Sequence, residues 1–261
     1  MANLIRSVKP GSDWTDNELR AYNIEVVPES VATFFGNSNL PPPTISPAIL
    51  AHETYPAAGL PHLPDDVRNF FDLLEAVMTP SEWWSAVVDF SIHLLRLLGY
   101  NKQNRIIRRR TIIPLYMCSA NTHTKTDVCV FDCTTERSLL LLQMDMQYPD
   151  GKDREPQLIA MAIAAFQFHN HRLSTLGLPT VNTAVIPGIT MVGTAPTFYK
   201  INVDTSLVEA VELGEYPTQT TIVHKLTPPV QVPEDFQRDG MQPLNNRAVI
   251  LSCFEAIKQF L

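Results

Sequence analysis

The spacing of apolar residues changes near residue 100, and this change most constrains the fold. Residues 63–78 and 79–100 carry apolar side chains at helical spacing. Residues 105–120, 126–134 and 137–148 are β-branched or aliphatic runs, which are typical of strands. The remaining predicted elements are helix 154–178, strand 186–204, helix 205–217, strand 220–226 and helix 245–261. This order predicts an α/β fold with a central mixed sheet flanked by helices.

The first 65 residues have a different character. The stretches "NSNLPPPTISP" and "YPAAGLPHLPDD" interrupt any regular pattern, because proline fixes φ and lacks a backbone donor. Aromatic residues such as Trp14 favour burial, so a free linker is not expected. A short helix is predicted with Ser12 or Thr15 as its N-cap. We expect residues 1–65 to form a proline-rich segment that wraps over an α/β domain of residues 66–261.

The charge of the chain limits its partners. Charged residues make up 18%, apolar residues 45%, and the net charge is −7. Nucleic-acid binding depends on a basic surface, so a nucleic-acid partner is not expected. One dense basic cluster, "NRIIRRRTII", contains Arg105, Arg108, Arg109 and Arg110. The simplest interpretation of this cluster is a solvated end of a strand or helix.

Neither a targeting segment nor a membrane segment is predicted. The N-terminal stretch "MANLIRSVKPGSDW" has no apolar region typical of a secretory signal. The longest apolar run, Leu139–Leu142, is too short to cross a bilayer. We therefore expect a cytoplasmic or nuclear protein that does not contact a membrane.

The stretch "LLLLQMDMQYPD", residues 139–150, is where a buried strand meets polar residues. Side chains alternate across a strand, so Met144 and Met146 share one face while Gln143 and Asp145 share the other. An ordinary core strand that ends in a solvated Asp145 would have the same sequence. Asp127, in "TDVCVFD", belongs to the preceding strand and could equally stabilise a turn.

This order of elements, with Asp127 on a hairpin strand and "QMDM" on the next, resembles the PD-(D/E)XK nuclease-like superfamily over residues 81–225. The stretches "PQLIAMAIAAFQ" and "IPGITMVGTAPTFYKI" look like basidiomycete members, in which Gln-Glu-Asp-Lys stands where this chain has "QMDM". The resemblance implies a restriction-endonuclease-like core. It also implies that a carboxylate at position 144 and Asp127 hold Mg²⁺ or Mn²⁺, with a lysine at position 146 stabilising the transition state.

The chain departs from this pattern at both decisive positions. Met144 replaces the acid and Met146 replaces the lysine, and a thioether is a poor ligand for Mg²⁺. Asp145 could substitute only if the strand bulged or slipped by one residue. Without that shift the site keeps Asp127 and Glu82 of the preceding helix. We therefore expect no cofactor, and Mg²⁺ or Mn²⁺ only if the nuclease interpretation holds.

Other residues complete the candidate site. Lys200, in "FYKI", is the best-placed lysine near the expected cleft, although a solvent-facing role is equally simple. Glu82 could instead belong to a capping box that begins at Thr79. The candidate catalytic residues are Asp127, Asp145 and Lys200, and the candidate binding residues are Glu82, Gln143, Met144, Met146, Trp84 and Tyr199.

Three functions follow from these residues. The first is a catalytically degenerate nuclease-fold protein that binds or scaffolds a small molecule or another protein. The second is an enzyme whose cleft, made apolar by the methionines with Trp84 and Tyr199, acts on a small organic molecule. The third is a divalent-metal-dependent phosphodiesterase or nuclease that uses Asp145.

Overall fold

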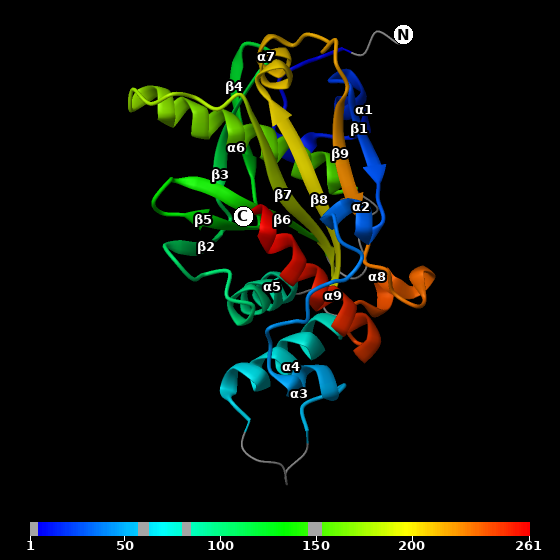
Figure 1. Cartoon of the computed structure of the whole chain (residues 1–261). Helices are drawn as coiled ribbons and strands as arrows, with labels where there is room; N and C mark the ends of the chain where they lie inside the picture. The colour runs from blue at the N-terminus through cyan, green and yellow to red at the C-terminus, as the bar shows by residue number, and fades with distance from the viewer. Residues whose placement is uncertain (1–4, 57–62, 80–84, 146–152) are drawn as a thin grey trace.

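The computed structural model describes residues 5–56, 63–79, 85–145 and 153–261. A mixed sheet of seven strands forms its centre, in the order β1-β9-β8-β7-β6-β5-β2. The β1/β9 and β6/β7 pairs are parallel and the other pairs are antiparallel. The strands are β1 (Ile24–Pro28), β2 (Arg105–Arg109), β5 (Val128–Asp132), β6 (Arg137–Asp145), β7 (Thr183–Val192), β8 (Ala195–Asp204) and β9 (Thr221–Leu226). Figure 1 shows β1 and β2 at opposite edges of this sheet.

Helices cover both faces of the sheet, which confirms the predicted α/β class with a large mixed sheet. They are α1 (Asp16–Ala21), α2 (Val31–Phe35), α3 (Pro47–Ala51), α4 (Asp65–Met78), α5 (Ser85–Leu97), α6 (Glu155–Thr175), α7 (Thr205–Leu213), α8 (Phe236–Asp239) and α9 (Leu244–Ile257). Three short 3₁₀ turns lie at Gly11–Asp13, Pro233–Asp235 and Lys258–Phe260. Helices α4, α5 and α9 pack in one apolar core, and α6 packs in the other.

The middle of strand β6, Leu139–Leu142, is apolar, and both of its faces are buried. Leu140, Leu142 and Met144 lie in the core that contains α4, α5 and α9. Leu141 points to the opposite core, against α6. By the same alternation, Gln143 and Asp145 face α6, as the sequence predicts.

The N-terminal segment contributes to the sheet as well as lying against it. Strand β1 pairs in parallel with β9, so the sheet includes residues on both sides of the expected boundary at residue 65. Helix α1 begins as predicted, with Thr15 as its N-cap. Thr15 and Glu18 form a reciprocal capping box, which satisfies two backbone donors at the start of the helix.

Two predicted strands are each divided by a turn. Residues 105–120 contain β2 and β3 (Ile112–Met117), with Arg110 between them in the left-handed region at φ 47°. Cys118 and Ser119, at φ 50° and 59°, then turn the chain into β4 (Ala120–Lys125), which pairs with β3 in a separate sheet. Gly193 similarly turns the predicted strand 186–204 into the β7/β8 hairpin. Within the described residues, no helix has the length and apolar character needed to span a membrane.

Candidate functional site

A charged cluster lies where β6 ends and α6 begins. Asp145 is the last residue of β6, and its buried carboxylate Oδ2 lies 2.9 Å from the Nε of Arg154. Arg154 is the N-cap residue of α6. The sheet and the helix thus bring opposite charges together, and Arg154 neutralises Asp145, the acid that could replace the missing carboxylate at position 144 only if the strand shifted by one residue.

Asp127 lies immediately before β5 and is also buried. Its Oδ2 accepts a hydrogen bond of 2.8 Å from the backbone N–H of Met144. Burial raises the pKa of Asp127, while the Met144 bond and the positive charge of Arg154 oppose that rise. Arg154 therefore acts electrostatically on both carboxylates of the candidate site.

A second ion pair lies beside the first. Glu155, the first residue of α6, is buried and places its Oε2 2.7 Å from the Nζ of Lys225 on β9. Lys225 is the cross-strand neighbour of Tyr199 on β8 and lies over its ring at 5.8 Å from the centroid. Burial and the nearby Glu155 carboxylate both raise the pKa of the Tyr199 phenol, so it stays protonated.

These two pairs line one cavity of about 510 Å³. It lies between α6, the β6–β9 part of the sheet and the segment around Pro233–Asp235. Its charged and aromatic lining residues are Asp145, Asp153, Arg154, Tyr199, Lys225, Glu234 and Phe236. Three acids and two bases on the wall give a polar site with a slight excess of negative charge.

Met144 is not among the residues that line this cavity. Its side chain is 1% exposed and packs with α5 and α9, on the opposite face of β6 from Asp145. A carboxylate at this position would enter an apolar core, where an ionised group is strongly disfavoured. The expectation that Met144 lines a cleft together with Tyr199 is therefore incorrect, because alternation along β6 and β8 sends the two side chains to different cores.

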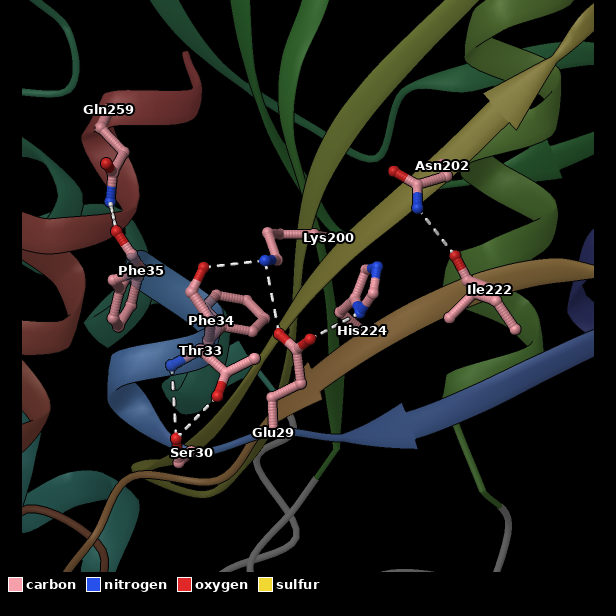
Figure 2. Close-up of polar contacts among 10 residues, drawn as sticks. All are labelled: Glu29, Ser30, Thr33, Phe34, Phe35, Lys200, Asn202, Ile222, His224 and Gln259. Atoms are coloured by element: carbon pink, nitrogen blue, oxygen red, sulfur yellow. Dashed lines mark hydrogen bonds and ion pairs between the residues drawn. The ribbon is translucent and has the colours of Figure 1, made fainter. Parts of the chain in front are cut away.

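Lys200 is likewise separated from Asp127 and Asp145, contrary to the sequence prediction. Figure 2 shows Lys200 beside Glu29 and α2, where its Nζ donates 2.8 Å to the carbonyl oxygen of Phe34. The Glu29 carboxylate lies 3.3 Å from the same Nζ. Lys200 and Tyr199 are consecutive on β8, so they must point to opposite faces of the sheet.

Of the remaining candidate residues, one is described by the structure and three are not. Gln143 is buried on the α6 face of β6 and lies beside Thr190 in the parallel register with β7. Glu82, Trp84 and Met146 lie outside the described residues. Thr79 ends α4 as its C-cap. Among the described residues, no group of three or more His, Cys, Asp and Glu side chains could hold a metal ion.

The sequence prediction does not include three charged residues of this candidate site: Arg154, Glu155 and Lys225. Arg154 and Glu155 start a helix that the sequence predicts, and charged residues at a helix start after a strand that ends in Asp145 are a usable signal. Lys225 offers no such signal, because its partner is on a helix far away in the chain.

No family model matches this chain, and no curated protein has significant sequence similarity to it, so geometry alone identifies the site.

Proposed function

We propose that this protein is a catalytically degenerate member of the PD-(D/E)XK nuclease-like superfamily, with a restriction-endonuclease-like core, that acts by binding. Its ligand site is the cavity between α6 and the β6–β9 part of the sheet. The observation that carries the proposal is the 2.9 Å ion pair between Arg154 and Asp145. Asp145 is the one acidic side chain of "QMDM", and a guanidinium paired with it leaves this stretch without a free carboxylate for a divalent cation.

The second acid of the expected metal site also favours binding over hydrolysis. Asp127 uses Oδ2 to accept the Met144 N–H, and its pKa is raised by burial. A carboxylate with a raised pKa holds a cation less readily, because a proton competes for the same oxygen. Both candidate carboxylates thus have protein partners.

The lining of the cavity indicates the class of ligand. Asp145, Asp153 and Glu234 outnumber the two bases, Arg154 and Lys225. This balance disfavours a phosphodiester and suits a small organic molecule that is neutral or carries a positive charge. The buried phenol of Tyr199 and the ring of Phe236 add aromatic surface to the same wall.

Calorimetric titration with Mn²⁺ tests the absence of a metal site. We expect no binding to the wild-type protein at concentrations up to about 1 mM, since Arg154 already compensates Asp145. Micromolar binding that is lost in both Asp127→Asn and Asp145→Asn would contradict the proposal. It would favour the metal-dependent phosphodiesterase, which cleavage of a DNA or RNA duplex in the presence of Mn²⁺ would then establish.

Ligand-observed NMR with a panel of small organic amines tests the cavity itself. Thr197 lines the cavity, so Thr197→Trp should fill it and abolish binding. Thr183→Trp, at the exposed start of β7, is the matched control and should leave binding unchanged. Amines that bind both variants equally, or bind neither variant nor the wild type, would contradict the assignment of this cavity.

A further inference from the structure

Strand β2 forms an edge of the central sheet, opposite to the edge formed by β1 (Figure 1). It pairs on one side with β5. In the part of the chain that the structure describes, no strand pairs with its other side. An edge of this kind presents backbone donors and acceptors to which an extended chain can add.

The register of the β2/β5 pair shows which backbone groups point outward. Arg110 donates its N–H to Asp127, and Asn104 accepts from the N–H of Cys133. Since hydrogen-bonded positions alternate along an antiparallel pair, the even-numbered residues of β2 face β5. The backbone groups of Arg105, Ile107 and Arg109 therefore point away from the sheet.

The side chains of β2 are basic on a protein whose net charge is −7. Three of the five residues of β2 are arginines, namely Arg105, Arg108 and Arg109. Arg108 lies 3.7 Å over the ring of Phe131, and Arg109 pairs with Asp89 of α5 at 3.0 Å. These contacts fix the direction of two arginines along the edge, on opposite faces of the strand.

A cavity of about 330 Å³ lies beside the same edge. Its walls include Arg108, Phe131, Ile112 and Phe168, and the ion pair of Arg172 with Glu136 also lies on the wall. Ile112 is 64% exposed. The edge thus combines backbone groups that can pair, positive charge and an apolar cavity within reach of side chains from an added strand.

We propose that the β2 edge binds an extended acidic segment of a partner protein, which adds to the sheet as an eighth strand beside β2. Its acidic side chains face Arg105 and Arg109 on one face of the strand, and an apolar side chain on the other face enters the cavity lined by Arg108, Ile112 and Phe131. This surface is separate from the cavity beside α6, so the inference does not depend on the proposed function.

Two other occupants fit less well. A second copy of the chain would bring the arginines of one β2 opposite those of the other, and like charges directly opposite each other destabilise a strand pair. A nucleic acid would use the positive charge, and its phosphates could accept from outward N–H groups, but it lacks the alternating donors and acceptors that pair with both the N–H and the C=O groups of Arg105, Ile107 and Arg109. The acidic peptide alone uses all three features of the surface.

Fluorescence anisotropy with a labelled peptide of alternating valine and glutamate tests this inference on the full-length protein. We expect saturable binding, and binding at least about tenfold weaker for the same peptide with alternate backbone nitrogens methylated. The methylated peptide keeps every charge but cannot pair as a strand. Amide hydrogen exchange should also slow at Arg105, Ile107 and Arg109 when the unmethylated peptide is present.

A pair of variants tests the same edge from the protein side. Arg109→Pro removes an outward N–H without removing a hydrogen bond to β5, whereas Arg109→Ala removes the charge and keeps the N–H. We expect Arg109→Pro to bind the peptide more weakly than Arg109→Ala. If Arg109→Pro does not fold, the comparison of the two peptides still decides the question.

Several results would overturn the inference. They are no binding of the valine–glutamate peptide at about 1 mM, equal binding of its methylated form, and equal binding of a valine–lysine peptide. Tighter binding of single-stranded oligothymidylate would replace the peptide with a nucleic acid. Self-association in sedimentation that Arg109→Pro abolishes would replace it with a second copy of the chain.

Discussion

At the scale of the residue, Asp127 combines a raised pKa with a hydrogen bond to the end of β6. Burial raises its pKa above the ordinary value of 3.8, so the folded protein holds the proton more tightly than the unfolded chain. The resulting loss of stability is complete above the folded-state pKa and disappears as the pH falls below 3.8. Asp127→Asn keeps an oxygen that can accept from Met144 and removes the buried charge.

We therefore expect Asp127→Asn to be more stable than the wild type at pH 7.5, with the difference vanishing at the acid end. Urea unfolding at pH 7.5 and at a pH below 3.8 measures the difference in stability between the variant and the wild type. Asp145→Asn is the matched control: it weakens the ion pair with Arg154 and should lower stability by about 1–2 kcal/mol at pH 7.5. A lower stability of Asp127→Asn at pH 7.5 would mean that its negative charge stabilises the fold.

At the scale of the element, Glu29 fastens the edge strand β1 to the rest of the sheet. Its carboxylate lies 2.8 Å from Nδ1 of His224 on β9 and 3.3 Å from Nζ of Lys200 on β8 (Figure 2). Lys200 also donates to the Phe34 carbonyl of α2. One partly buried acid at the end of β1 thus contacts β8 and β9, and Lys200 extends the cluster to α2, an arrangement that the sequence alone does not predict.

Glu29→Gln should lower the free energy of unfolding by about 1–3 kcal/mol, because Lys200 loses its charged partner in a partly buried position. Glu25→Gln is the control, since Glu25 is an exposed residue of β1, the strand that Glu29 follows, and should change stability by less than about 0.5 kcal/mol. Urea unfolding and amide exchange of β1 measure the two effects. Equal stabilities would show that the cluster does not hold β1 in place.

At the scale of the whole molecule, the sequence predicts elements better than it predicts their neighbours. Helical spacing identifies α4 because apolar residues repeat on one face, and Thr15 marks the start of α1. The sequence does not predict β4, because the exposed positions of this strand are polar and the Cys118–Ser119 turn is its only signal.

The same contrast holds for the candidate site, where the sequence predicts a residue but not its neighbours. Asp145 could be found because the end of a buried strand is a local pattern. Its surroundings could not, because Lys225 meets Glu155 only after β9 and α6 have packed on the same part of the sheet. The predicted position of Lys200 is wrong for a related reason. The alternation of side chains along β8 is visible in the sequence, but which of these side chains face α6 is not.

Arg247 of α9 joins the segment around α3 to the C-terminal part of the chain. Its guanidinium is fully buried and donates to five carbonyl oxygens, those of Ile49, His52, Glu53, Met241 and Gln242. Burial lowers its pKa to about 10, which still leaves it charged at neutral pH. The segment around α3 and the C-terminal helix should therefore unfold together.

Arg247→Met should lower the free energy of unfolding by about 3–5 kcal/mol, because it leaves buried carbonyl groups without a donor. The free energy of unfolding of Arg247→Lys should lie between those of the wild type and Arg247→Met. An ammonium keeps the charge but cannot donate to five acceptors as the planar guanidinium does. Arg238→Met, at an exposed and ion-paired arginine, is the control and should change stability by about 0.5 kcal/mol or less. Urea unfolding measures all three, and proteolysis near His52 in Arg247→Met should precede global unfolding. Equal stabilities of Arg247→Met and Arg238→Met would mean that the N-terminal segment is held by its apolar contacts alone.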